Sequence, residues 1–180
     1  MSARSTLLGR RIHIAGSIAK DESVASKADA DRARQIVAGL VKALAKLGAD
    51  FVIPVDADPK RGDGESLTFD WTVWENLESG LGTRPKDASE KFAIGVQHNK
   101  TEEQIPSERV ALWDKLKASP GLGFDNASYW TMNAKRMEIA ARSGDVLITL
   151  GGTEGVLYLA DLYHAAGKPV IPLDLPITPS

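Results

Sequence analysis

Apolar and polar positions divide the start of the chain into a strand, a helix and a second strand. In "RRIHIAG", residues 10–16, apolar and polar side chains alternate as in a short strand. Across 29–47 the apolar residues recur at helical spacing, which predicts an amphipathic helix that ends before Gly48. The run "ADFVIPV", 49–55, predicts the next strand. This β-α-β unit predicts two parallel strands joined by a right-handed crossover.

The end of the chain repeats this pattern. A helix is predicted from about Asn126, its N-cap, to Gly144. The strand "DVLITL", 145–150, is apolar on both faces, as parallel strands tend to be. A helix within 153–166 and a strand within 168–173 complete the pattern. The sequence therefore predicts a Rossmann-like α/β fold with three layers, α/β/α, and a mostly parallel sheet.

Between 56 and 125 the periodicity weakens. The stretch begins with turn residues and continues with a short helix in "FDWTVWENL", a strand-like "EKFAIGVQ" and a helix in "PSERVALWDKLKAS". We interpret 56–125 as a structured insertion within a single nucleotide-binding domain that spans 1–180. Trp71, Trp74 and Trp113 lie in it, either as core beneath a long loop or with one of them lining a ligand site.

Composition narrows the function classes. A chain of 180 residues suffices for one domain with a sizeable core. The net charge of −2 gives no electrostatic case for binding nucleic acid or an anionic membrane, and the absence of cysteine removes disulfides and thiolate chemistry. No segment reads as a signal peptide or approaches the roughly 18 apolar residues of a membrane span. We expect a cytoplasmic domain, either whole or a fragment of a longer effector protein.

Two loops follow predicted strands, where ligands bind in open α/β sheets. The first is "AGSI", with Gly16, Ser17 and Ile18, and the second is "GGTEG", residues 151–155. Glycines allow close backbone approach, and a helix N-terminus favours an anion, so the loops suggest a phosphate cradle. The alternative is that the glycines only make turns. Neither loop matches the P-loop or GxGxxG patterns.

The helix "NAKRMEIAAR" adds Asn133, Lys135 and Arg136 as candidates. Arg136 shares a helical face with apolar residues and needs a partner, which is either a carboxylate such as Glu138 or a bound phosphate or ribose.

Other polar residues give weaker signals. The histidines at 13, 98 and 164 lack metal-ligand spacing and read as structural or surface residues. The aspartates at 56 and 58 follow a strand and either bind ribose hydroxyls or cap a turn, which we favour. The glutamates at 75 and 78 are acid/base candidates without a visible pairing.

"IHIAGSI", "NAKRMEIAARSGDVLITLGG" and "GKPVIPL" resemble the SLOG superfamily, which includes the Lonely Guy phosphoribohydrolases and the DNA-processing protein family. The Lonely Guy spacing of arginine and aspartate is kept by Arg136 and Asp145. Their PGGxGTxxE motif is not kept. Leu150, Val156 and Leu159 stand at its proline, threonine and catalytic glutamate, and neither Glu154 nor Asp161 fills the glutamate position. The departure implies binding without cleavage, because leucine cannot assist water or stabilise charge on the ribose.

"AGSI", the "FDW" of the middle segment and the GGxxG loop without glutamate are more similar to the STALD branch, SLOG domains associated with sirtuin-like and TIR domains. This resemblance implies a regulatory sensor of Thoeris anti-phage systems that binds a cyclic ADP-ribose-type nucleotide and requires no cofactor. It implies a homo-oligomer that activates an attached or associated NAD-consuming, TIR or other effector domain. The implied ligand-binding residues are Gly16, Ser17, Ile18, Asn133, Lys135, Arg136, Gly151, Gly152, Thr153, Glu154 and Gly155.

Two alternatives stay open. One is a nucleotide phosphoribohydrolase or deoxyribosyltransferase-like enzyme that uses Glu154, Asp161 or a carboxylate of the middle segment. The other is an assembly module whose glycine loops are only turns.

Overall fold

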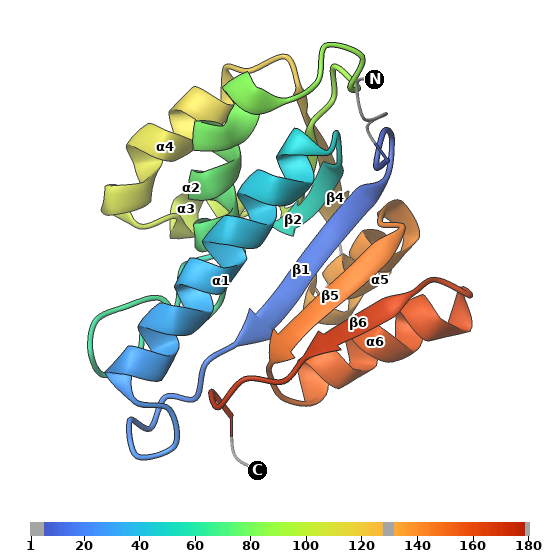
Figure 1. The fold of residues 1–180 in the computed structure, drawn as a ribbon. Coiled ribbons are helices and arrows are strands. Elements are labelled where there is room, and N and C mark those ends of the chain that lie inside the picture. Colours follow the sequence, from blue (N-terminus) through green and yellow to red (C-terminus); the bar gives the residue numbers. More distant parts are fainter. Residues whose placement is uncertain (1–5, 128–131, 179–180) are drawn as a thin grey trace.

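The sheet has six strands in the order β4-β3-β2-β1-β5-β6, and every neighbouring pair is parallel. The computed structural model describes residues 6–127 and 132–178, with only the backbone of 132 and 133. Helices α1, α2 and α4 cover one face of the sheet, and α5 and α6 cover the other (Figure 1). The predicted three-layer Rossmann-like fold is therefore confirmed.

The elements follow one another as β1 (Arg11–Ser17), α1 (Lys27–Lys46), β2 (Asp50–Pro54), α2 (Asp70–Gly80), a 3-10 turn η1 (Leu81–Thr83), β3 (Ala93–His98), α3 (Thr101–Gln104), α4 (Ser107–Lys117), β4 (Leu122–Ala127), α5 (Met132–Ser143), β5 (Val146–Gly151), α6 (Glu154–Ala165) and β6 (Val170–Leu173).

The central strands are apolar on both faces because helices cover both. In β1, Ile12 and Ile14 pack into the large core under α1, whereas Ala15 faces the smaller core under α5 and α6. In β5, Ile148 joins the first core and Leu147 the second. Alternate residues of a strand point to opposite faces, so a strand between two helical layers needs apolar side chains at nearly every position.

Helix α1 forms the first crossover, close to its predicted range of 29–47. Its buried stripe consists mostly of alanine and valine, which lets the helix lie near the sheet. Ser26 caps it: the Oγ atom accepts a hydrogen bond from the Asp29 N–H at 3.1 Å. Gly48 follows its end with φ +87, a conformation that favours glycine at a helix C-terminus.

The middle segment, predicted as an insertion, supplies β3 and β4 and so extends the same sheet beyond β2. Its tryptophans are core residues: Trp113 makes edge-to-face contacts with Trp71 and Trp74 at centroid distances of 6.4 and 6.0 Å. The indole N–H groups of Trp71 and Trp74 donate to the carbonyls of Asp56 and Pro54. These bonds hold α2 against the end of β2.

The helix predicted from Asn126 begins later, and the prediction of Asn126 as its N-cap is wrong. Asn126 lies in β4, where its side-chain oxygen accepts a hydrogen bond from the Gln97 amide at 2.9 Å. In the described chain α5 begins at Met132. β4 is an edge strand with alternating exposure, so polar side chains are tolerated there and the apolar signal of a strand is weak.

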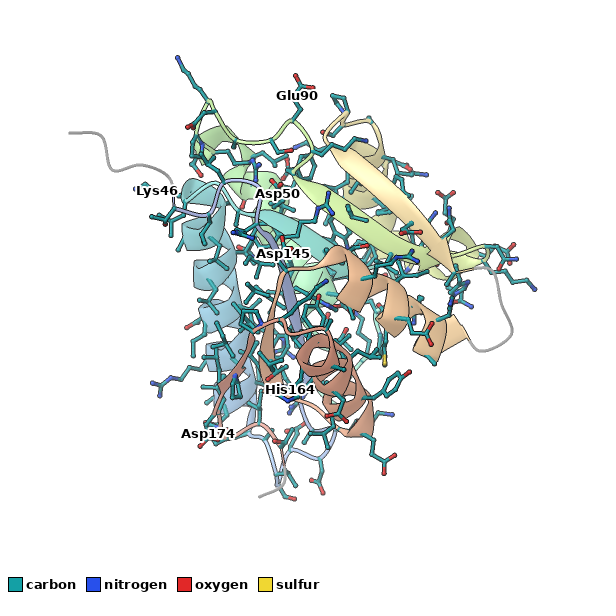
Figure 2. All side chains as sticks on the ribbon, turned by 90° about the vertical axis from the view of Figure 1, so that its right-hand side faces the viewer. Lys46, Asp50, Glu90, Asp145, His164 and Asp174 are labelled. Carbon is teal, nitrogen blue, oxygen red and sulfur yellow. The ribbon has the colours of Figure 1, made fainter. Side chains whose placement is uncertain are left out.

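The strand order reverses between β1 and β5, because the chain leaves β1 towards β2 and later returns to β5 on the other side. Such a reversal opens a crevice at the carboxyl ends of the strands. Figure 2 shows Asp50 and Glu90 towards the amino end of the sheet and Asp174, which follows β6, towards the carboxyl end. No helix in the described part of the chain has both the length and the apolar character needed to cross a membrane.

Candidate functional site

A cavity of about 260 Å³ occupies this crevice, between β1, the middle of α5 and the start of α6. Its wall is formed by His13, Ala15, Gly16, Ser17, Pro54, Asp56, Thr68, Asp70, Arg136, Met137, Ala140, Thr153, Gly155, Val156 and Leu159. The side towards α5 and α6 is mostly apolar, whereas the side towards β2 and α2 carries carboxyl groups. A ligand would therefore meet two chemically different walls.

The stretch before α2 runs back along the end of β1. Ser17 and Thr68 form an antiparallel bridge, and the Ile18 N–H donates to the Leu67 carbonyl at 2.9 Å. Asp70, the first residue of α2, is thereby carried into the pocket wall. The turn-rich segment after β2 therefore forms part of the site.

Asp56 and Asp70 form a carboxyl pair beside Arg136. Burial raises the pKa of Asp70 well above its ordinary value, and the neighbouring Asp56 raises it further by repulsion and by a hydrogen bond, while the Arg136 charge lowers it. Arg136 also donates from Nη1 to the Val55 carbonyl at 3.1 Å. The guanidinium therefore belongs to the carboxyl side of the pocket, where it partly offsets the charge of the pair.

His13 is buried in the pocket wall on β1, with an exposed fraction of 1%. Burial lowers the pKa of His13 from 6.5 to about 4, so the imidazole is neutral at neutral pH. Its Nδ1 atom lies 3.3 Å from the Tyr163 hydroxyl, and that hydroxyl also contacts the Ala140 carbonyl at 3.1 Å. Burial raises the pKa of Tyr163, which keeps the phenol protonated.

The "GGTEG" loop turns sharply from β5 into α6. Gly151 and Gly152 have φ +56 and +106, and a Cβ atom on Gly152 would lie 2.3 Å from Val156 Cγ2. Thr153 and Gly155 then line the pocket at the start of α6. The first N–H groups of a helix have no intrahelical acceptor, so this corner suits an anion.

The packing of the sheet itself explains why residue 16 is glycine. A Cβ atom there would lie 1.9 Å from the Leu150 carbonyl oxygen of the neighbouring strand β5. Glycine at this position is therefore required for the pairing of β1 with β5, whether or not a ligand approaches it.

The structure brings five of the predicted site residues together in the pocket wall: Gly16, Ser17, Arg136, Thr153 and Gly155. The others lie elsewhere. Ile18 is core, Gly151 and Gly152 form the turn, Glu154 is exposed, and Lys135 pairs with Glu138 at 2.9 Å. The side chain of Asn133 lies outside the described residues.

The weaker candidates also lie partly inside and partly outside the pocket wall. Asp56 both lines the pocket and makes the favoured turn, because its carboxylate accepts the Asp58 N–H at 2.9 Å. Glu75 and Glu78 instead form ion pairs with Arg109 and Lys115, and Asp161 is exposed. No cluster of three or more potential metal ligands occurs among the residues that the structure describes. The described pocket wall contains none of the tryptophans.

Sequence reasoning missed His13 as a pocket residue, and it missed Asp70 and Thr68. Within "FDW" Asp70 is a polar residue between aromatic core residues, which was the available signal. His13 alternates with isoleucines in a strand, and only the tertiary arrangement opens a cavity above it.

Leu159 lines the pocket and is 4% exposed. This part of the pocket wall is therefore apolar. The carboxyl groups of the pocket come instead from the opposite side, through Asp56 and Asp70.

Residues 7–180 match the family described as ATP nucleosidase Cap17-like, N-terminal. Two curated relatives, both ATP nucleosidase Cap17, come from Escherichia coli strain KTE188 and from Escherichia coli. Each is 26% identical over 170 residues, which make up 90% of this chain but only 31% of the relative. The chain therefore spans well under half the length of these relatives.

Among solved structures, DNA processing protein A from Helicobacter pylori, described for its single-stranded DNA binding mode, superposes with a TM-score of 0.58 at 16% identity. The match covers 93% of this chain and 66% of that one. At this identity the likeness concerns the fold alone, and it agrees with the SLOG resemblance at that level. The match over residues 7–180 shows that the chain belongs to the ATP nucleosidase Cap17-like, N-terminal family.

Proposed function

We propose that this chain is a nucleotide-binding regulatory domain of a longer protein, and that the ligand binds in the pocket between β1, α5 and α6. The observation that carries the proposal is the arrangement of this pocket. The start of α6 offers backbone N–H groups for a phosphate, and apolar residues offer a surface for a base. Leu159 stands where the Lonely Guy resemblance aligns the hydrolases' glutamate. Such a site holds a nucleotide without an acid or base on the α6 side.

The size of the pocket bears on the ligand. Ligand pockets commonly measure about 300–1,000 Å³, so about 260 Å³ suits one nucleoside phosphate unit. We propose a cyclic ADP-ribose-type nucleotide, in line with the STALD resemblance, with one nucleoside unit inside and the remainder towards solvent. We propose an anti-phage role with a homo-oligomeric receptor, and an effector in the part of the protein beyond this chain.

For such a domain to regulate an effector, the ligand must bind one arrangement of the protein more tightly than another. Because β1, α5 and α6 all contribute to the wall, a ligand that contacts all three would favour one spacing of these elements. Analytical ultracentrifugation with and without ligand tests whether this change reaches the oligomer.

Calorimetry tests the binding. We expect one of the cyclic ADP-ribose isomers, ADP-ribose, NAD, ATP and AMP to bind the wild-type chain. Arg136→Ala should weaken that binding by about 1.5–3 kcal/mol if a charged hydrogen bond to the ligand is lost. The matched control is Arg142→Ala on the same helix, since Arg142 is exposed and lies outside the pocket. Failure of every nucleotide to bind would refute the proposed function.

One observation favours a second function, cleavage of the N-glycosidic bond. Asp70 with its raised pKa and Asp56 beside it form the kind of carboxyl pair that serves as acid and base. In this reaction the bond from C1′ to the base nitrogen breaks and a bond from C1′ to the water oxygen forms. Asp56 would take the proton of the water, and Asp70 would give its proton to the departing base.

Chromatographic detection of free base distinguishes the two functions. If the chain cleaves ATP, AMP or NAD, then Asp70→Asn should reduce the rate at least a hundredfold, as loss of a general acid typically does by about 10²–10⁴. Nucleotide binding without any base release from the wild-type chain would exclude the enzymatic function.

A further inference from the structure

The hydrogen bonds around Tyr163 fix the tautomer of His13. A phenol has one proton, and the Tyr163 hydroxyl donates it to the Ala140 carbonyl at 3.1 Å, a shorter contact than the 3.3 Å to His13 Nδ1. The contact between the Tyr163 oxygen and His13 Nδ1 is then a hydrogen bond only if the imidazole carries its proton on Nδ1. Since a neutral imidazole has one N–H, the Nε2 atom is left as an acceptor.

This acceptor is buried without a partner. His13 Nε2 makes no hydrogen bond to any residue that the structure describes, and neither does Thr68 Oγ1. Both residues belong to the wall of the same pocket. An unpaired buried acceptor costs about 1–3 kcal/mol, so its retention here points to a partner that enters the pocket.

The surroundings of His13 indicate what kind of group that partner carries. Ala15, Ala140 and Leu159 line the same pocket, which makes this part of the wall apolar and suited to a flat aromatic ring. Asp56 and Asp70 make the opposite side unfavourable for phosphate, while the start of α6 favours it. A nucleotide would therefore place its base near His13 and its phosphate near Thr153 and Gly155.

We propose that His13 is a specificity-determining residue that accepts a hydrogen bond through Nε2 from the exocyclic amino group of an adenine-type base. The inference rests on the proposed nucleotide-binding function and adds the residue that recognises the base. A hypoxanthine base presents an oxygen at the same place, which would face the Nε2 lone pair, so the site should reject it. Tyr163 is a positioning residue, because it acts only by fixing the tautomer of His13.

The ligand experiment compares AMP and IMP, which differ at this position of the base, by calorimetry at pH 7. The wild-type chain should bind AMP roughly tenfold to a hundredfold more tightly than IMP, since IMP leaves a buried acceptor unpaired. His13→Phe should weaken AMP binding about tenfold and remove the preference. His164→Phe is the matched control, because His164 lies on α6 (Figure 2), where it is exposed and does not line the pocket. It should retain both affinities.

An NMR experiment tests the tautomer without any ligand. The imidazole ¹⁵N shifts distinguish Nδ1–H from Nε2–H, and the chain has only 3 histidines, so His98→Gln and His164→Gln assign His13 by elimination. We expect the Nδ1–H tautomer in the wild-type chain and a mixture in Tyr163→Phe. These measurements remain informative if His13→Phe does not fold.

The outcomes separate the two proposals. An Nε2–H tautomer or a protonated ring at pH 7 overturns the role of His13, as does equal affinity for AMP and IMP. A chain that shows the Nδ1–H tautomer but binds no nucleotide at all overturns the proposed function and, with it, the assignment of the base.

Discussion

The buried imidazole of His13 should make the stability of this chain depend on pH in a defined window. Its pKa falls from 6.5 to about 4 on folding, so between these values the unfolded chain binds more protons than the folded one. The free energy of unfolding is then fully retained above pH 6.5 and decreases as the pH falls towards 4. A shift of this size corresponds to about 3 kcal/mol, of which about 2 kcal/mol is lost between pH 7 and pH 5.

Urea unfolding followed by tryptophan fluorescence measures this loss, because Trp71, Trp74 and Trp113 are buried in the folded chain. Asp70 contributes to the pH dependence of stability with the opposite sign. Its raised pKa means that the folded state holds the proton more tightly, so its contribution to stability is lost as the pH rises. The informative quantity is therefore the difference between the wild-type chain and His13→Asn, which cancels the contributions of the other groups.

We expect the wild-type chain to lose about 2 kcal/mol more than His13→Asn between pH 7 and pH 5. His164→Asn, at an exposed position, should follow the wild-type curve. Equal pH dependence of the wild-type chain and His13→Asn would show that His13 is not buried as a neutral ring, and it would refute the reasoning.

Four further substitutions test separate features of the structure. Asp70→Asn should raise the stability at pH 7, because it removes a carboxyl whose ionisation is opposed by burial and by Asp56; a lower urea midpoint would contradict this. Gly152→Ala should destabilise the folded chain by more than about 1 kcal/mol, because φ is +106 and the new Cβ meets Val156. Gly39→Ala, in the open middle of α1, should instead stabilise the folded chain by about 1 kcal/mol in thermal unfolding. Ser26→Ala should cost about 1 kcal/mol through loss of the α1 cap, and unchanged stability would mean that the Asp29 N–H finds another acceptor.

The sequence revealed most of the fold where apolar periodicity was strong. Helix α1 and strands β1, β2 and β5 follow from spacing alone, because each buries much of its apolar surface. Helix α6 and strand β6 were also predicted from their apolar residues, although α6 buries only Leu159 and Tyr163 and β6 buries no residue fully. The strand β4 could not be predicted in this way, since Asp125 and Asn126 are polar and β4 lies at the edge of the described sheet, beside β3. For the site, the two glycine loops and Arg136 were identifiable because strand ends and helix starts have known positions in such folds.

The remaining part of the site depends on tertiary contacts. Asp70 reaches the pocket only because the stretch around Thr68 pairs with the end of β1, and this pairing has no signature in the sequence. Arg136 could be identified as a cation in need of a partner, but its position beside Asp70 required the structure. Gly16 appeared to make room for a ligand, whereas the Leu150 carbonyl is what excludes a side chain there.

The two sides of the pocket come from distant parts of the chain. Asp56 follows β2 and Asp70 begins α2, whereas Thr153 and Gly155 lie at the start of α6. A molecule that bonds to both sides would act as a removable cross-link between the two halves of the sheet. At a concentration of 100 times its dissociation constant it would add about 2.7 kcal/mol to the free energy of unfolding. A bound ligand would then make the two halves of the sheet unfold together, even where the positions of their atoms hardly change.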